Sequence, residues 1–200
     1  MKLIAISSPE FIPVEAAMIN SLLREGLECM HIRKPGSTRD DFAGLLSEIE
    51  PAFLDRIALH QHHELTAEFG VRRLHFTENE RRITSDAQQE KLRENRFVLS
   101  TSIHDLVELK NISTVFSYTF FGPVFDSISK SGYKSAVAKD FFMAEKSKRI
   151  PVIALGGIDV LNIQNVRKMN FDGAAVLGAL WRNPSRALEI FRTLAALADR

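Results

Sequence analysis

A chain of 200 residues is long enough to bury a substantial core, and its 26 basic and 25 acidic side chains leave a formal net charge of +1. That balance gives no overall field to draw the chain to nucleic acid or a membrane, and no apolar run approaches the roughly 20 residues of a membrane helix. The single cysteine, Cys29, excludes an internal disulfide, so we expect one soluble cytoplasmic domain over residues 1–200.

Short apolar runs alternate with amphipathic runs along the whole chain. The expected strands are Lys2–Ser8, Leu27–Lys34, Arg56–Gln61, Arg72–Thr77, Phe97–Ser102, Val115–Phe121, Val152–Leu155 and Gly173–Leu180. The expected helices are Val14–Glu25, Asp40–Glu50, His62–Phe69, Ala87–Glu94, His104–Lys110, Phe141–Lys148, Val160–Met169 and Pro184–Ala198. Polar loops are expected at Glu78–Asp86 and between Gly122 and Asp140.

Eight strands alternating with helices predict a parallel sheet, and eight is the number that closes a (β/α)₈ barrel. An open doubly wound sheet is the alternative, but no G-x-G-x-x-G motif follows the first strand. We therefore predict a compact α/β barrel in which any active site lies at the carboxyl ends of the strands.

Two glycine turns follow the last two strands. The uncharged stretch Pro151–Ile158 ends its strand in Gly156-Gly157, and the next strand reaches Leu177-Gly178. Glycines let a ligand approach the backbone closely, and their N–H groups can point at an anion. Because barrels commonly bind phosphate after these two strands, we predict a phosphate cradle there.

Other strand ends carry polar side chains. Cys29, His31 and Arg33 share one face of the second strand by the period of two. In the run from His60 to His63, His60 and His62 share a face only if the strand continues. No H-E-x-x-H spacing is present either, so this run does not favour a metal site.

Taken in order, these strand ends resemble one family over nearly the whole chain: thiamine-phosphate synthase and its relatives, the TenI-type thiazole tautomerases, which are (β/α)₈ barrels. The stretches that carry the resemblance are FFGPVFDSISK (Phe120–Lys130), PVIALGGI (Pro151–Ile158) and GAAVLGAL (Gly173–Leu180), supported by LSTSIH (Leu99–His104) and MHIRK (Met30–Lys34). The synthase joins a pyrimidine diphosphate to a thiazole phosphate and releases pyrophosphate.

The resemblance assigns expected roles. It implies that Arg33 and Lys130 bind the pyrophosphate and that Ser102 contacts the pyrimidine or the pyrophosphate. Ser127 and Ser129 stand where the family loop has two threonines. Gly157, Leu177 and Gly178 fall on the family's backbone cradle for the thiazole phosphate.

The chain departs from the synthase pattern at several of these strand ends. His31 replaces a glutamine, Pro35 replaces a lysine, and His60-Gln61 replaces an Asn-Asp pair. Glu80 falls on the second metal-binding aspartate, so the implied Mg²⁺ would rest on Glu80 and, weakly, Gln61, with help from substrate phosphates.

Three functions remain open. The first is a diverged synthase acting on small phosphorylated substrates. The second is a thiazole tautomerase with His31 or His104 as its base, although the tautomerases place a histidine where this chain has Pro123. The third is a barrel that only binds or senses a thiamine precursor. A homo-oligomer is compatible with each.

Overall fold

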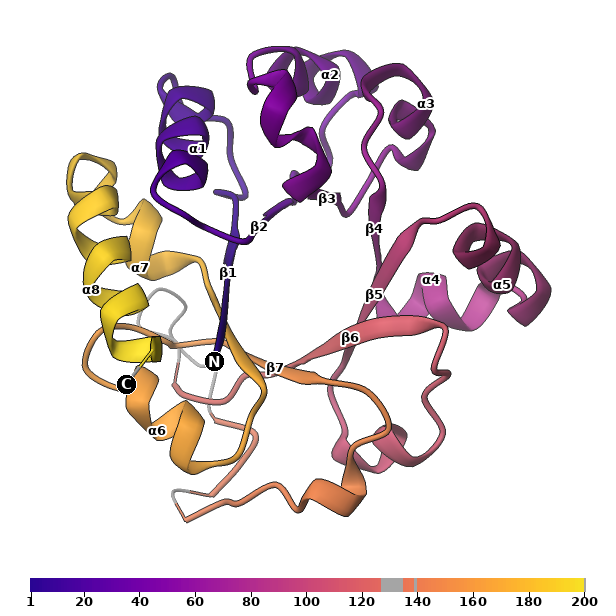
Figure 1. The fold of residues 1–200 in the computed structure, drawn as a ribbon, viewed down its shortest axis with the longest axis vertical. Coiled ribbons are helices and arrows are strands. Elements are labelled where there is room, and N and C mark those ends of the chain that lie inside the picture. The colour runs from indigo at the N-terminus through magenta and orange to yellow at the C-terminus, as the bar shows by residue number, and fades with distance from the viewer. Residues whose placement is uncertain (127–134, 139, 200) are drawn as a thin grey trace.

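Eight parallel strands close into a barrel with helices around it (Figure 1). The computed structural model describes residues 1–126, 135–138 and 140–199. The strands are β1 (Lys2–Ile6), β2 (Cys29–Ile32), β3 (Ile57–Leu59), β4 (Arg73–Phe76), β5 (Val98–Ile103), β6 (Phe116–Phe121), β7 (Val152–Leu155) and β8 (Gly173–Val176). Each pairs with the next, and β8 pairs with β1. The predicted (β/α)₈ barrel is confirmed, and the open-sheet alternative is wrong.

The connections on the outside of the barrel contain α-helices and short 3₁₀ turns. The α-helices are α1 (Glu15–Arg24), α2 (Arg39–Ser47), α3 (Thr66–Phe69), α4 (Glu78–Ile83), α5 (Asp86–Glu94), α6 (Ile163–Lys168), α7 (Gly178–Trp181) and α8 (Ala187–Asp199). The 3₁₀ turns are Pro51–Arg56, His63–Leu65, Leu106–Lys110, Glu145–Ser147 and Pro184–Arg186. Among the described residues, no helix has the length and apolar character needed to cross a membrane.

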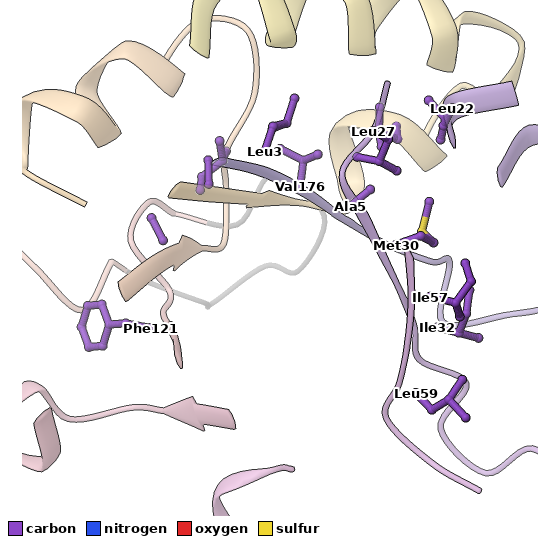
Figure 2. Packing of buried hydrophobic residues seen from close by; sticks show 14 of the residues in the cluster. Leu3, Ala5, Leu22, Leu27, Met30, Ile32, Ile57, Leu59, Phe121 and Val176 are labelled. Carbon is purple, nitrogen blue, oxygen red and sulfur yellow. The ribbon is translucent and has the colours of Figure 1, made fainter. Parts of the chain in front are cut away.

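Alternation along each strand divides the core into two layers. In β1, Leu3 and Ala5 face the helices, whereas Ile4 and Ile6 face the barrel interior. Figure 2 shows part of the outer layer, with Leu3, Ala5 and Met30 along their strands. Burying a large apolar side chain contributes about 1.5–3 kcal/mol relative to exposing it, so this layer holds the helices on the barrel.

The interior layer has an apolar side and a polar side. Ile4, Ile6, Ile153 and Ala175, from β1, β7 and β8, give one side of the interior an apolar surface. The inward positions of β2, β4, β5 and β6, together with the residue after β3, give the other side its polar groups: His31, His60, His75, Ser100, Ser102 and Tyr118. The interior of such a barrel is usually filled by branched apolar residues, so the polar side is the unusual one.

The barrel closes where its first and last strands meet. Lys2 and Gly173 begin the paired register of β1 and β8. The indole N–H of Trp181, the only tryptophan in the chain, donates to the carbonyl of Ile6 at 2.6 Å. This bond ties α7, just after β8, to the end of β1.

The polar pattern of Glu78–Asp86 predicts a loop, but its first six residues form α4. A capping box explains the difference. The Thr77 hydroxyl accepts from the N–H of Glu80, and the Glu80 carboxylate accepts from the N–H of Thr77. An ion pair between Arg82 and Glu78, one turn apart, adds to the helix.

Several other expected helices are shorter than predicted, and three of them show why. Phe141–Lys148 holds only the turn Glu145–Ser147, because the N–H of Met143 donates to the carbonyl of Met169 instead of to its own segment. In the expected helix His104–Lys110, only the residues from Leu106 onward are helical, and they form a 3₁₀ turn. The Val160–Met169 helix begins at Ile163, because the side chain of Asp159 caps the N–H of Leu161 in a preceding turn.

Candidate functional site

The glycine turns after β7 and β8 line one cavity. Gly156, Gly157, Leu177 and Gly178, the four residues predicted as a phosphate cradle, all border a space of about 390 Å³. Gly156 and Gly157 have φ angles of +100° and +65°, a backbone region that favours glycine. A Cβ on Gly157 would lie 2.5 Å from the carbonyl oxygen of Asp126. The chain therefore needs glycine here for both conformation and space.

The same cavity has polar residues that the sequence analysis did not single out. Asp159, Arg182 and Asn183 also line it. Arg182 follows α7 directly, and its backbone N–H donates to the carbonyl of Gly178 at 3.2 Å. Its place one turn after the predicted glycine was the signal that could have found it. Arg182 gives the cavity a cation suited to an anionic ligand.

Three histidines meet inside the barrel. His31 lies in β2, His60 directly follows β3, and His75 lies in β4. The Nδ1 atom of His31 is 2.9 Å from the Nε2 atom of His60. The rings of His60 and His75 stack with their centroids 4.0 Å apart. We call these three residues the histidine cluster.

Hydroxyl groups hold the outer edges of the cluster. The Nε2 atom of His31 is 2.6 Å from the Tyr118 hydroxyl. The two nitrogens of His75 lie 3.0 Å and 2.9 Å from the hydroxyls of Ser100 and Ser102. Ser102, a predicted site residue, is half-buried and carries this network toward the barrel mouth.

Burial sets the charge state of the cluster. Together with a smaller contribution from the positive charge of Arg73, it lowers the pKa of His31 to about 3. Burial also holds the pKa values of His60 and His75 well below the usual range, with added repulsion from neighbouring rings and Arg33. The three imidazoles are therefore neutral near pH 7, and His31 is a poor general base there.

The cluster differs from the histidine arrangement considered from sequence. β3 ends at Leu59, and His62 has a φ of +53°, so His60 and His62 do not continue one strand face. His62 instead contacts the carbonyl of Ser37 at 3.1 Å, and His63 contacts the carbonyl of Leu59 at the same distance. Only His60 of that run enters the barrel cluster.

The two residues after β2, Arg33 and Lys34, face in opposite directions. Arg33 follows the inward-facing alternation of His31, is half-buried, and donates its backbone N–H to the Ser7 hydroxyl at 2.9 Å. Lys34 faces the other way. Its ammonium group is buried against the Glu15 carboxylate at 2.5 Å and donates to the carbonyls of Ser8 and Glu10.

Burial raises the pKa of Glu15 and lowers the pKa of Lys34, while their mutual contact opposes both shifts. The pair fastens the segment after β1 to the end of β2, so Lys34 has a structural contact in place of a position at the mouth. It does not substitute for the lysine that Pro35 replaces.

The two predicted Mg²⁺ ligands are engaged in other contacts. An oxygen of the Glu80 carboxylate accepts from the N–H and the hydroxyl of Thr77, both at 2.7 Å. The side-chain oxygen of Gln61 accepts from the backbone N–H of Lys34 at 3.0 Å. One carboxylate and one amide are oxygen donors of the kind Mg²⁺ takes, but they are too few to hold it without substrate oxygens.

Lys130, Ser127 and Ser129, the predicted loop residues after β6, lie outside the described residues. Their roles stay predictions.

The sequence profile of the family described as thiamine monophosphate synthase (TMP-TENI) matches residues 3–180. The chain belongs to this family. A crystal structure of thiamine phosphate pyrophosphorylase from Bacteroides thetaiotaomicron is 31% identical, with a TM-score of 0.79, and the alignment covers 100% of this chain and 98% of that one.

Two thiamine-phosphate synthases are similar to this chain over different lengths. That of Lysinibacillus sphaericus is 25% identical over 190 residues, covering 88% of this chain and 86% of that protein. That of Hydrogenobaculum is 31% identical over 100 residues, where the chain spans about half of the relative (47%). Thiamine phosphate pyrophosphorylase from Pyrococcus furiosus, at 16% identity and a TM-score of 0.77, shares the fold.

Proposed function

We propose that this protein is a diverged thiamine-phosphate synthase. In the proposed reaction, the bond between the pyrimidine methylene carbon and pyrophosphate oxygen breaks, and pyrophosphate leaves with the electron pair. The thiazole nitrogen then forms a bond to that carbon. Family membership supports the assignment, and one structural observation carries it: the cavity beside Gly156, Gly157 and Gly178 lies where a barrel of this kind takes a phosphate.

In this proposal, the cavity after β7 and β8 binds the phosphate of the thiazole substrate. Backbone N–H groups of the glycine turns can donate to the phosphate oxygens, and Arg182 adds a positive side chain. The volume of about 390 Å³ is within the range of small-ligand sites.

The pyrophosphate is assigned to the opposite, polar side of the mouth. Arg33 follows β2 on the inward face, and Ser102 lies in β5 with its hydroxyl oriented by His75. A positioned guanidinium stabilises the negative charge that develops on the leaving pyrophosphate. Lys130, with Ser127 and Ser129, completes the proposed set.

Mg²⁺ belongs to the proposal as a substrate-assisted ion. Glu80 would supply its carboxylate and Gln61 its amide oxygen, with the remaining oxygens from the pyrophosphate. When bound, the ion would neutralise charge on the leaving group. We expect Mg²⁺ to bind measurably only when pyrophosphate is present.

The tautomerase alternative now favours His104 over His31. His104 is exposed near the carboxyl end of β5, and its Nδ1 atom lies 2.8 Å from the Glu78 carboxylate, a pairing that orients a catalytic base. His31 is fully buried with both nitrogens hydrogen-bonded. Deuterium exchange from solvent into a thiazole carboxylate substrate would identify this activity.

The deciding assay supplies the pyrimidine diphosphate, the thiazole phosphate and Mg²⁺, and measures thiamine phosphate and pyrophosphate. We expect slow formation of both products. Pro35→Lys with Gln61→Asp should raise the rate, because Pro35 is exposed and the pair restores a cation and a carboxylate. If neither protein makes product, the synthase assignment fails. Deuterium exchange then separates the tautomerase from a barrel that only binds thiazole phosphate.

The remaining assignments accompany this proposal. The partners would be small phosphorylated molecules rather than nucleic acid or membrane, in keeping with the net charge of +1. The cytoplasm and a homo-oligomeric state stay predictions.

A further inference from the structure

The histidine cluster has the geometry of a metal-binding site. One ring nitrogen from each of His31, His60 and His75 lies within 4.8 Å of the other two. In the part of the chain that the structure describes, no other group of three His, Cys, Asp or Glu side chains converges in this way. The rings come from three consecutive βα units, so the barrel backbone fixes their relative positions.

The spacing suits a small ion. Zinc bonds to imidazole nitrogen at about 2.0–2.1 Å, so two tetrahedral ligands lie roughly 3.3 Å apart. His31 and His60 are closer, at 2.9 Å, because they share a hydrogen bond. If the two nitrogens moved apart by a few tenths of an ångström, each could bond to one ion in place of the hydrogen bond between them.

The surroundings of the rings also match a metal site. A ligating histidine usually fixes its other ring nitrogen through a hydrogen bond, which orients the ring. Here the Tyr118 hydroxyl holds the Nε2 atom of His31 at 2.6 Å, leaving Nδ1 for the ion. The hydroxyls of Ser100 and Ser102 each hydrogen-bond one nitrogen of His75. One of these bonds can therefore keep the ring in place while the other nitrogen binds the ion.

Stability alone does not explain the cluster. Burying imidazoles is costly, and barrels of this type fill the same layer with apolar side chains, as Ile4, Ile6 and Ile153 do on the other side of this one. The donor set also selects the ion. Three imidazoles without a carboxylate suit zinc, cobalt, nickel or copper, whereas Mg²⁺ requires oxygen ligands.

We propose that His31, His60 and His75 form a binding site for one divalent transition-metal ion of the zinc type, with its fourth position toward Ser102 and the barrel mouth. The site is distinct from the Mg²⁺ of the proposed synthase reaction. It is tested by direct binding, so its outcome does not depend on whether the protein makes thiamine phosphate.

The test uses untagged full-length protein, stripped with a chelator and dialysed. Calorimetric titration with Zn²⁺ should give one equivalent per chain, and Mg²⁺ should give none. Co²⁺ should produce the visible absorption of a tetrahedral site with nitrogen ligands. Failure of the wild-type protein to bind Zn²⁺ would overturn the proposal without any variant.

Variants then locate the ion. His60→Gln and His75→Asn should each weaken Zn²⁺ binding by about 100-fold or more, and Tyr118→Phe by about 10-fold. His104→Gln removes an exposed histidine as the matched control and should bind as the wild type does. Circular dichroism checks that each variant is folded. A zinc anomalous peak among the three rings supports the site; a peak elsewhere, or equal binding by all variants, contradicts it.

Discussion

The two sides of the barrel offer different chemical groups to a ligand. After β7 and β8, glycine backbone forms part of the cavity wall; it carries fixed dipoles, does not titrate and leaves no room for a side chain at Gly157. Inside the barrel below the opposite side, His31, His60 and His75 offer neutral side-chain nitrogens whose donor and acceptor roles depend on the tautomer. One side is suited to an anion, and the other to a group that neutral nitrogens can bind.

The largest expected effect is on kcat, and it tests whether the polar side of the mouth stabilises the leaving pyrophosphate. Arg33→Ala should lower kcat in the synthase assay by about 10²–10³-fold, because a positioned donor that stabilises developing charge is worth that much. The KM for the thiazole phosphate should change little, since the site proposed for its phosphate lies on the other side. Arg39→Ala, which removes an exposed arginine paired with Glu68, is the control. An unchanged kcat in Arg33→Ala would mean that the pyrophosphate is bound elsewhere.

The next effect tests whether the cavity is a rigid backbone site. Gly157→Ala should lower the free energy of unfolding by roughly 2–4 kcal/mol, because strain at positive φ adds to a clash with the carbonyl of Asp126. Gly70→Ala is a matched control, since its φ is +71° but nothing lies within 4 Å of its Cβ position. It should lose only about 1–2 kcal/mol. Equal losses in urea denaturation would show that the loop yields.

The buried histidines should make the free energy of unfolding depend on pH. Because the pKa of His31 is lowered from 6.5 to about 3, the unfolded chain takes up a proton first as the pH falls. The stabilisation is therefore present above about pH 6.5 and is lost at about 1.4 kcal/mol per pH unit below it.

Urea denaturation at several pH values tests this expectation. His31→Gln should show a shallower loss of stability between about pH 6 and pH 4, by the slope of one proton. His104→Gln, at an exposed position, controls for the loss of a histidine. Parallel profiles for His31→Gln and the wild type would indicate that the ring is accessible to protons in the folded state.

The smallest effect sharpens the assignment of the cavity. Arg182→Gln should raise the KM for the thiazole phosphate by about 10-fold and leave kcat nearly unchanged, as expected for one charged hydrogen bond to a phosphate. Arg186→Gln removes a nearby arginine that pairs with Glu189 on the surface, and should have no effect. A fall in kcat without a change in KM would place Arg182 in the chemistry instead.

The difference between the two sides also explains what the sequence could predict. Gly156, Gly157, Leu177 and Gly178 stand at the ends of contiguous uncharged runs, so the strand pattern alone brought them to one edge. The histidine cluster has no such signature. His31 and His60 are 29 residues apart, and their contact depends on the register of β2 against β3.

The helices that differ from the sequence pattern do so for local and tertiary reasons. The capping box of Thr77 and Glu80 was readable as T-x-x-E, yet the polar character of Glu78–Asp86 suggested a loop. The segment Phe141–Lys148 has a helical pattern, but Met143 bonds to Met169 across the fold, a tertiary contact invisible to local pattern. To predict that Arg182 lines the cavity, one would need to know the direction of the short helix α7 after β8.

The bond from Trp181 to Ile6 gives the protein an optical reporter of its own. Because this is the only tryptophan in the chain, the tryptophan fluorescence of the protein comes from one place, the seam where β8 meets β1. Opening of that seam would release the indole N–H to water and shift its emission to longer wavelength. Since α7 also carries Gly178 of the cavity, ligand titrations and barrel opening can both be followed without labels in the unmodified protein.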